Sequence, residues 1–275
     1  MPRLRVGDAD LYYEVHGEGP PIVLAHGVGG NHASWYHQLE AFACTYRVIT
    51  IDQRGFGLST DPDRRGRSAF IDDLTAVLDH CQLEQVALIG QSMGGATVAG
   101  FTCTHPARVR ALVLADTLAG LRESGPIKAR MDQARAATGH LSQAERVLGP
   151  RIRADHPELA LLYGQIASFN ATSIKTVAGE PRPWSTEELA ASAVPVLFVV
   201  GRDDALFPAD VVRAVRAQVP NSFLVELADT GHSAYFENPH AFNDSVLSFL
   251  QKVGCPGLRS DPERRSERSK GGDHA

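Results

Sequence analysis

Residues 86–95 of the chain read VALIGQSMGG. The apolar run 86–89 is typical of a buried strand, and the residues after Ser92 are compatible with a helix. A G-x-S-x-G pattern between a strand and a helix predicts a turn so sharp that only small side chains fit beside the serine. Such a turn would project the Ser92 hydroxyl above the carboxyl edge of a sheet.

Short apolar runs like this one recur along the chain, and helix-compatible segments alternate with them. The runs are too short for buried helices, so they predict interior strands of a parallel sheet covered on both faces. With an N-terminal hairpin within residues 4–16, the alternation predicts an α/β fold with a doubly wound, mostly parallel, eight-stranded sheet. The other predicted strands are 21–25, 47–51, 86–90, 109–115, 194–200 and 222–227, and the predicted helices are 32–43, 69–81, 93–105, 209–218 and 239–252.

One connection is much longer than the rest, because about 75 residues separate the strand ending at 115 from the next one. A structureless loop of that length is improbable in a compact domain. Its composition is helical over 128–138, 142–153 and 157–168. We therefore predict a helical lid, residues 118–190, inserted into a core of residues 1–117 and 191–254. Apolar residues become rare after that, which predicts a disordered charged tail over 255–275.

Composition limits the partners. The 275 residues carry a net charge of −5, so the sequence lacks the basic footprint of a nucleic-acid-binding protein. No apolar run approaches the ~20 residues of a membrane span, and no signal-peptide core opens the chain. Four scattered cysteines indicate free thiols in a reducing compartment. These features predict a cytoplasmic protein that acts on a small molecule, with neither nucleic acid nor membrane as partner; a monomer and a homodimer both stay open.

A serine becomes an effective nucleophile only with a base within hydrogen-bond reach. The chain has eleven histidines, and most of them lie in predicted helices, caps or the tail. His232 differs, because it lies in a loop directly after the predicted strand 222–227. His232 is therefore the predicted base.

The base in turn needs a carboxylate that holds its tautomer. The predicted strand 194–200 runs into a loop that carries two adjacent carboxylates, Asp203 and Asp204. Asp116, at the end of the strand 109–115, is a third candidate. Chain position by itself leaves the choice among these three open.

Acyl transfer also needs backbone N–H groups aimed at the oxygen that becomes negative. Met93, the residue after the serine, is one predicted donor. The segment His26-Gly27-Val28-Gly29-Gly30 follows the strand 21–25, and its glycines allow the backbone to approach a substrate closely. Val28 is the second predicted donor, and we expect His26 to bond to the backbone of this turn.

Together these segments resemble the α/β-hydrolase superfamily, and within it the lid-bearing bacterial esterases and lactonases. The resemblance extends over roughly residues 4–252. In relatives of this type the acid is the third residue after a glycine, with a proline four residues further on, which selects Asp204. The segment 52–59 is expected to be structural, with Asp52 and Arg54 fixing a loop. The matching segments are HGVG (26–29), DQRGFGLS (52–59), GQSMGG (90–95), GRDDALFP (201–208) and GH (231–232).

The resemblance implies a serine hydrolase that cleaves a carboxylic ester or lactone through an acyl-serine. Its catalytic residues would be Ser92, Asp204 and His232, with the N–H groups of Val28 and Met93 at the oxyanion. No cofactor or metal is expected, because the chain has neither a dinucleotide fingerprint after the first strand and helix nor histidines and carboxylates at ligand spacing. Dehalogenases and epoxide hydrolases of this fold use a carboxylate nucleophile, so Ser92 argues against both.

Two other functions stay open. Hydrolysis of a carbon–carbon bond in a vinylogous keto acid uses the same triad, with a basic lid residue on the substrate carboxylate. A ligand-sensing receptor of the same fold would keep the triad and turn over slowly. Candidates for the basic lid residue are Arg130, Arg135, Arg151 and Arg153.

Overall fold

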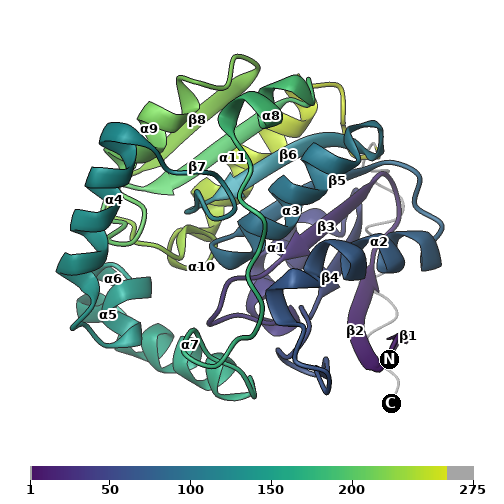
Figure 1. The fold of residues 1–275 in the computed structure, drawn as a ribbon, viewed down its shortest axis with the longest axis horizontal. Helices are drawn as coiled ribbons and strands as arrows, with labels where there is room; N and C mark the ends of the chain where they lie inside the picture. The colour runs from purple at the N-terminus through teal and green to yellow at the C-terminus, as the bar shows by residue number, and fades with distance from the viewer. Residues whose placement is uncertain (1, 259–275) are drawn as a thin grey trace, which may run out of the picture.

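An eight-stranded sheet forms the centre of the protein in a computed structural model that describes residues 2–258 (Figure 1). Its strands lie in the order β1-β2-β4-β3-β5-β6-β7-β8. β2 pairs antiparallel with β1 and β4, and the other neighbours are parallel. The predicted fold class is confirmed. The strands are β1 (Arg3–Val6), β2 (Ala9–His16), β3 (Pro21–Ala25), β4 (Arg47–Ile51), β5 (Val86–Gln91), β6 (Val109–Ala115), β7 (Val196–Gly201) and β8 (Ser222–Leu227).

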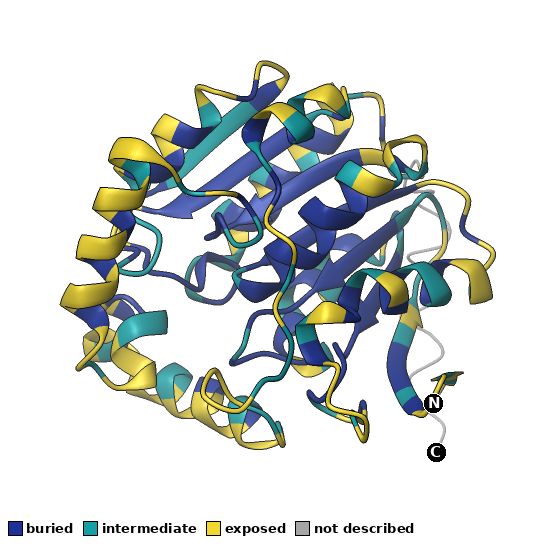
Figure 2. Cartoon of the chain, viewed as in Figure 1, coloured by how far each residue is buried: buried dark blue, intermediate teal, exposed yellow. Residues whose placement is uncertain are grey.

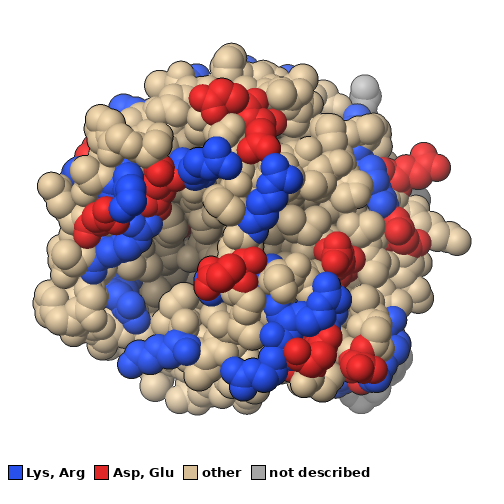
Figure 3. Space-filling view, in the orientation of Figure 1, with Lys and Arg blue, Asp and Glu red and all other residues tan. Residues whose placement is uncertain are grey.

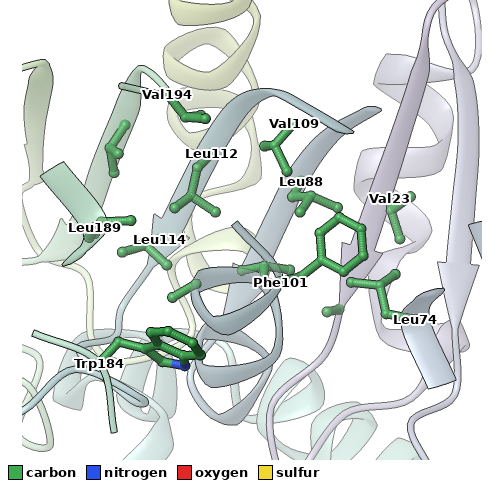
Figure 4. Close-up of a cluster of buried hydrophobic side chains, with 14 of the residues drawn as sticks. Val23, Leu74, Leu88, Phe101, Val109, Leu112, Leu114, Trp184, Leu189 and Val194 are labelled. Atoms are coloured by element: carbon green, nitrogen blue, oxygen red, sulfur yellow. The ribbon is translucent and has the colours of Figure 1, made fainter. Parts of the chain in front are cut away.

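Helices cover both faces of this sheet. On one face α2, α3, α8 and α9 contribute to one buried apolar cluster, and on the other α1, α10 and α11 contribute to a second. Figure 4 shows part of the first cluster, where Phe101 of α3 lies near Leu88 of β5 and Val23 of β3. These helices are α1 (Tyr36–Phe42), α2 (Phe70–His80), α3 (Met93–Thr104), α8 (Thr186–Ala191), α9 (Ala209–Arg216), α10 (Ala234–Glu237) and α11 (Pro239–Lys252).

The central strands β5 and β7 are almost entirely apolar because both of their faces are covered. Every residue of β5 and of β7 is buried, as Figure 2 shows by the dark blue at the centre of the sheet. Full burial of a Val, Leu, Ile or Phe side chain stabilises the fold by about 1.5–3 kcal/mol. The edge strand β1 alternates between exposed and half-buried residues instead.

Of the five helices between β6 and β7, the first four form the insert: α4 (Gly125–Thr138), α5 (Gln143–Val147), α6 (Pro150–Asp155) and α7 (Pro157–Ser168). They follow the left and lower edge of the molecule in Figure 1, and much of their surface is exposed in Figure 2. The segment 142–153, whose composition predicted helix, forms two helices rather than one. Leu148 has an extended backbone, and Pro150 starts a new helix because its fixed φ suits a first turn while its missing N–H cannot continue the previous helix.

The two ends of the insert meet. Leu121 and Trp184 form an isolated parallel bridge, in which the Arg122 N–H donates to the Trp184 carbonyl and the Trp184 N–H to the Gly120 carbonyl, both at 2.7 Å. The chain therefore leaves the core and returns to it at one point. α8, which the sequence prediction included in the lid, follows this point, and its Leu189 packs in the apolar cluster of the core.

The loop after β4 is held by buried charge. Arg54 is almost fully buried and donates to both carboxylate oxygens of Asp73 in α2, at 2.9 and 2.6 Å. Asp52 accepts hydrogen bonds from the backbone N–H groups of His32 and Leu58. Both side chains thus have the structural role that the sequence predicted for them.

The chain stays packed past α11. Cys255 is buried and its carbonyl accepts from the Tyr46 hydroxyl at 2.9 Å, while the Leu258 N–H donates to the Thr45 carbonyl at 2.8 Å. The predicted start of the tail at 255 was therefore too early, since the Cys255 side chain is apolar enough to be buried. Residues 259–275 lie outside the described residues.

All four cysteines lie within residues 2–258, and each is a free thiol. In the same part of the chain no helix combines the length and the apolar character that crossing a bilayer requires.

Candidate active site

Ser92 lies in the turn between β5 and α3 with a strained backbone, φ 49° and ψ −118°. The Ser92 N–H donates to the Ala115 carbonyl of β6, and the Thr117 hydroxyl donates to the Ser92 carbonyl. Gly94 has to lack a side chain, because a Cβ there would lie 2.1 Å from the Ala25 carbonyl oxygen. These contacts hold a conformation that costs about 1–3 kcal/mol and that presents the Ser92 side chain to solvent.

His232 follows β8 and is paired with Asp204, which follows β7. The distance from His232 Nδ1 to Asp204 Oδ2 is 3.0 Å, and both side chains are buried. The other oxygen of Asp204 accepts from the N–H groups of Leu206 and Phe207, and the Phe207 ring stacks on the imidazole. Because Asp204 engages Nδ1, Nε2 is the nitrogen left for a serine hydroxyl.

The other two candidate acids do not contact His232. Asp203 is exposed. Asp116 is fully buried, but its two oxygens accept from the Gly201 and Ala234 N–H groups, each at 2.9 Å. Burial, and then the negative charge of Asp204, raise the pKa of Asp116 well above its ordinary value. Asp116 thus ties the end of β7 to the segment that follows His232.

The two predicted oxyanion donors lie together. Val28 and Met93 both pack against a small apolar cluster with Phe56 and Phe70. Within residues 2–258 neither the Val28 N–H nor the Met93 N–H donates a hydrogen bond to another residue. Gly27 permits the approach, because a Cβ there would lie 2.2 Å from Gln91 Oε1 and 2.9 Å from Ser92 Cβ.

His26 holds the loop that carries Val28. It is fully buried; its Nδ1 lies 2.7 Å from the Gly27 carbonyl, and its Nε2 accepts from the Gln53 N–H at 3.0 Å. Burial lowers the pKa of His26, which favours the neutral ring. The expected bonding of His26 to backbone is present, and it makes this histidine structural.

A cavity of about 100 Å³ joins Val28, Ser92 and His232. In Figure 3 a hollow opens between the insert and the sheet, with side chains of both charges along its rim. Within residues 2–258 no group of His, Cys, Asp and Glu side chains is placed to hold a metal ion. The cavity is lined by Val28, Gly29, Gln91, Ser92, Gln143, Arg146, Val147, Tyr163, Ile174, Leu206 and His232.

The family model of the alpha/beta hydrolase fold matches residues 20–239 of this chain. The chain belongs to the α/β-hydrolase family. The protein RutD of Azorhizobium caulinodans, named as a carbamate hydrolase, is 30% identical to this hydrolase in an alignment 269 residues long that covers 92% of this chain and 99% of RutD.

Two solved structures resemble this hydrolase over nearly their whole length. A thermophilic esterase from Thermogutta terrifontis superposes with a TM-score of 0.78 at 27% identity, covering 92% of this chain and 99% of the esterase. Est816, described as an N-acyl homoserine lactone degrading enzyme, gives 0.77 at 27% identity, covering 90% and 100%. The predicted resemblance to esterases and lactonases is confirmed.

Gln91 is a residue of the candidate site that sequence reasoning missed, and it contacts the backbone of His232. Its side chain is buried between the serine turn and the base, and its Nε2 donates to the His232 carbonyl at 3.0 Å. Gln91 occupies a variable position of the G-x-S-x-G pattern, so the pattern gives no signal for this role.

Glu237 of α10 is a second missed residue. One of its oxygens accepts from the Gly149 and Gly231 N–H groups at 2.9 Å each, and the other accepts from the Ser233 N–H at 3.0 Å. Gly231 and Ser233 flank His232, whereas Gly149 lies between α5 and α6 of the insert. Glu237 therefore joins the insert to the loop that carries the base. Burial raises the pKa of Glu237.

The four insert arginines named from the sequence do not line the cavity. Arg130 pairs with Asp210 and Arg135 with Glu123 and Asp132. Arg151 pairs with Asp155 and Asp229, and Arg153 donates to the Leu148 carbonyl. The arginine that lines the cavity is Arg146, which the sequence analysis did not single out.

Proposed function

We propose that this α/β hydrolase cleaves a carboxylic ester or a lactone through an acyl-serine on Ser92. The observation that carries the proposal is the cavity: it is lined by Ser92 and by His232, whose Nδ1 is bonded to the buried Asp204. Among the 25–30% identical relatives are an esterase and a lactone-degrading enzyme, which supports the same bond type.

The reaction follows from these positions. His232 Nε2 takes the proton of the Ser92 hydroxyl as Oγ attacks the carbonyl carbon. The N–H groups of Val28 and Met93 bind the resulting oxyanion; a donor of this kind contributes about 10²–10³-fold to the rate. Asp204 keeps the imidazole in the required tautomer and stabilises the imidazolium.

Collapse of the tetrahedral intermediate breaks the carbon–oxygen bond, and the imidazolium protonates the leaving alcohol. In a lactone the alcohol stays attached to the acyl chain. Water then attacks the acyl-serine with His232 as base, which releases the acid and restores Ser92. No step requires a metal or a cofactor.

We further propose that the insert acts as the lid of this site. Tyr163 of α7 and Val147 of α5 line the cavity opposite the sheet, as does Ile174 after α7. Walls of this kind exclude water and shape the acyl or alcohol pocket. Location in the cytoplasm and a monomeric or dimeric state stay predictions from the sequence.

The test is steady-state hydrolysis of short and medium 4-nitrophenyl esters, simple lactones, an aryl carbamate and a vinylogous keto acid. Ser92→Ala should lower kcat on esters or lactones by on the order of 10⁶. Ser168→Ala, an exposed serine of α7, is the matched control and should keep wild-type rates.

Each of the other outcomes of this substrate panel would indicate a different function. Rapid cleavage of the keto acid alone would indicate carbon–carbon hydrolysis, and turnover of the carbamate alone would indicate an activity like that named for RutD. Tight ligand binding without turnover would indicate a receptor. Near-wild-type ester hydrolysis by Ser92→Ala would contradict Ser92 as nucleophile.

A further inference from the structure

Arg146 is the only lysine or arginine among the residues that line the cavity. No Asp or Glu side chain lines the cavity beside it. We propose that Arg146 forms an anion-binding subsite and that the preferred ester or lactone carries a carboxylate. This inference rests on the proposed function, because it names the substrate class of the same site.

The helix α5 directs Arg146 toward the cavity. Gln143 and Arg146 are three residues apart and share one face of the helix, and both line the cavity, as does Val147. Gln143, Ala144 and Glu145 are exposed, whereas Arg146 is half-buried, and of the two residues between Gln143 and Arg146 neither lines the cavity. The inward face of α5 thus offers an amide and a guanidinium to a bound molecule.

The carboxylate next to Arg146 in sequence is engaged elsewhere. Glu145 accepts from the Ser142 N–H at 2.8 Å and from the Ser142 hydroxyl at 2.6 Å, in the capping box that starts α5. The Arg146 side chain makes no hydrogen bond or ion pair with any residue of the described range 2–258. The other arginines of helices α4–α7, which are Arg130, Arg135, Arg151 and Arg153, all have such partners, so among these helices Arg146 is distinguished by its free guanidinium as well as by its place.

A half-buried guanidinium beside apolar walls favours an anionic ligand. Val28, Val147 and Leu206 line the same cavity with apolar surface, and no carboxylate among the lining residues competes for the charge. A carboxylate matches the planar fork of arginine and can accept two parallel N–H···O bonds. The Gln143 amide can donate a further bond. A substrate with a carboxylate would gain these contacts, whereas a neutral ester of the same shape would leave the cation without a partner.

The experiment compares charged and neutral esters of equal length. The probes are the mono-4-nitrophenyl esters of succinic, glutaric and adipic acid, each beside its neutral methyl ester, with correction for spontaneous hydrolysis. Wild type should prefer one of the charged esters, and Arg146→Gln should lower kcat/KM for it about 10–100-fold. The neutral esters should change less than about threefold, and Arg146→Lys should retain part of the preference because it keeps the charge without the fork.

Arg151→Gln is the matched control, since Arg151 also lies in the insert but pairs with Asp229 outside the cavity. It should leave the charged-to-neutral ratio unchanged. The subsite is overturned if wild type shows no preference for any charged ester, or if Arg146→Gln slows charged and neutral esters equally. In either case, loss of ester cleavage in Ser92→Ala would show that the proposed function still holds.

Binding tests the subsite without turnover. Calorimetry of glutarate binding to Ser92→Ala, with and without Arg146→Gln, should show affinity that depends on Arg146. If no ester is cleaved but this dependence is present, the proposed function fails and the anion subsite stands. If glutarate binds equally to both variants, the subsite is wrong.

Discussion

The divided roles of the buried carboxylates show how position within a few ångströms decides what a residue does. Asp204 gives one oxygen to His232 and the other to two backbone N–H groups. Asp116 is equally buried, but both of its carboxylate oxygens accept hydrogen bonds from backbone N–H groups. At the residue scale, therefore, Asp204 acts directly on the imidazole, whereas Asp116 positions the segments around it.

Replacing Asp204 by asparagine tests this division. Asparagine keeps the size of the side chain but can place an amide N–H₂ against Nδ1, which favours the wrong tautomer of His232. We expect kcat to fall by about 10⁴-fold with little change in the fold, by analogy with triads of this type. Asp203→Asn, an exposed neighbour, should keep activity within a few-fold. Greater loss in Asp203→Asn than in Asp204→Asn would reverse the assignment.

At the scale of elements, α10 connects the insert to the loop that carries His232. The single carboxylate of Glu237 accepts N–H groups from the junction of α5 and α6 and from both neighbours of His232. These three donors belong to buried residues, so water cannot replace the carboxylate without structural change. The Glu237 side chain therefore couples the position of the insert to the position of His232.

Glu237→Ala should weaken both positions at once. It leaves three buried N–H groups without acceptors, and we expect the free energy of unfolding to fall by about 2–4 kcal/mol. Misplacement of His232 should lower kcat by up to about 100-fold. Hydrogen exchange should accelerate together at the amides of Gly149, Gly231 and Ser233. Glu187→Gln, at an exposed site on α8, is the control; faster exchange at only one of the three amides would contradict the coupling.

At the scale of the whole molecule, the loops after β3 and β4 are joined by a charged pair. His32 Nδ1 lies 2.8 Å from Asp52 Oδ2, and Glu14 of β2 lies 4.0 Å from His32 Nε2. Burial lowers the pKa of His32, but the hydrogen bond and charge of Asp52, together with Glu14, outweigh burial and raise it. The folded protein thus binds this proton more tightly than the unfolded chain.

This pair makes stability depend on pH. The contribution of protonated His32 should be complete below the ordinary histidine pKa of about 6.5 and should disappear as pH rises through the higher folded value. Urea unfolding of wild type and His32→Gln should therefore differ most at acidic pH and converge above neutrality. His156→Gln, an exposed histidine of the insert, should show no comparable convergence. A wild-type advantage that stays constant across this range would refute the linkage.

The fold could be predicted from sequence because its signals are local. The run Val86–Ile89 and the glycines around Ser92 specify a strand, a turn and a helix within a dozen residues. The break at Pro150 was visible in the sequence, but helix-compatible residues on both sides concealed it. α8 belongs to the core because its Leu189 packs in the apolar cluster on the sheet. The composition of the segment does not show this contact.

The residues that support the site could not be predicted from the sequence, because their contacts join residues that are far apart along the chain. Gln91 and His232 are 141 positions apart, and Glu237 acts on Gly149 from 88 positions away. The lack of a partner for Arg146 becomes evident only when the partners of the other arginines of α4–α7 are known. Each of these roles depends on which side chains the folded chain places side by side.

The bridge between Leu121 and Trp184 also bears on how such an enzyme changes its substrates. A segment whose ends are already neighbours can vary in length at small entropic cost, because closure of the loop is provided by the bridge rather than by the segment. The stretch between these two residues is in this sense an exchangeable cassette. If the proposed function holds, chimeras that carry the corresponding stretch of another hydrolase should inherit its selectivity while Ser92 and His232 remain those of the recipient.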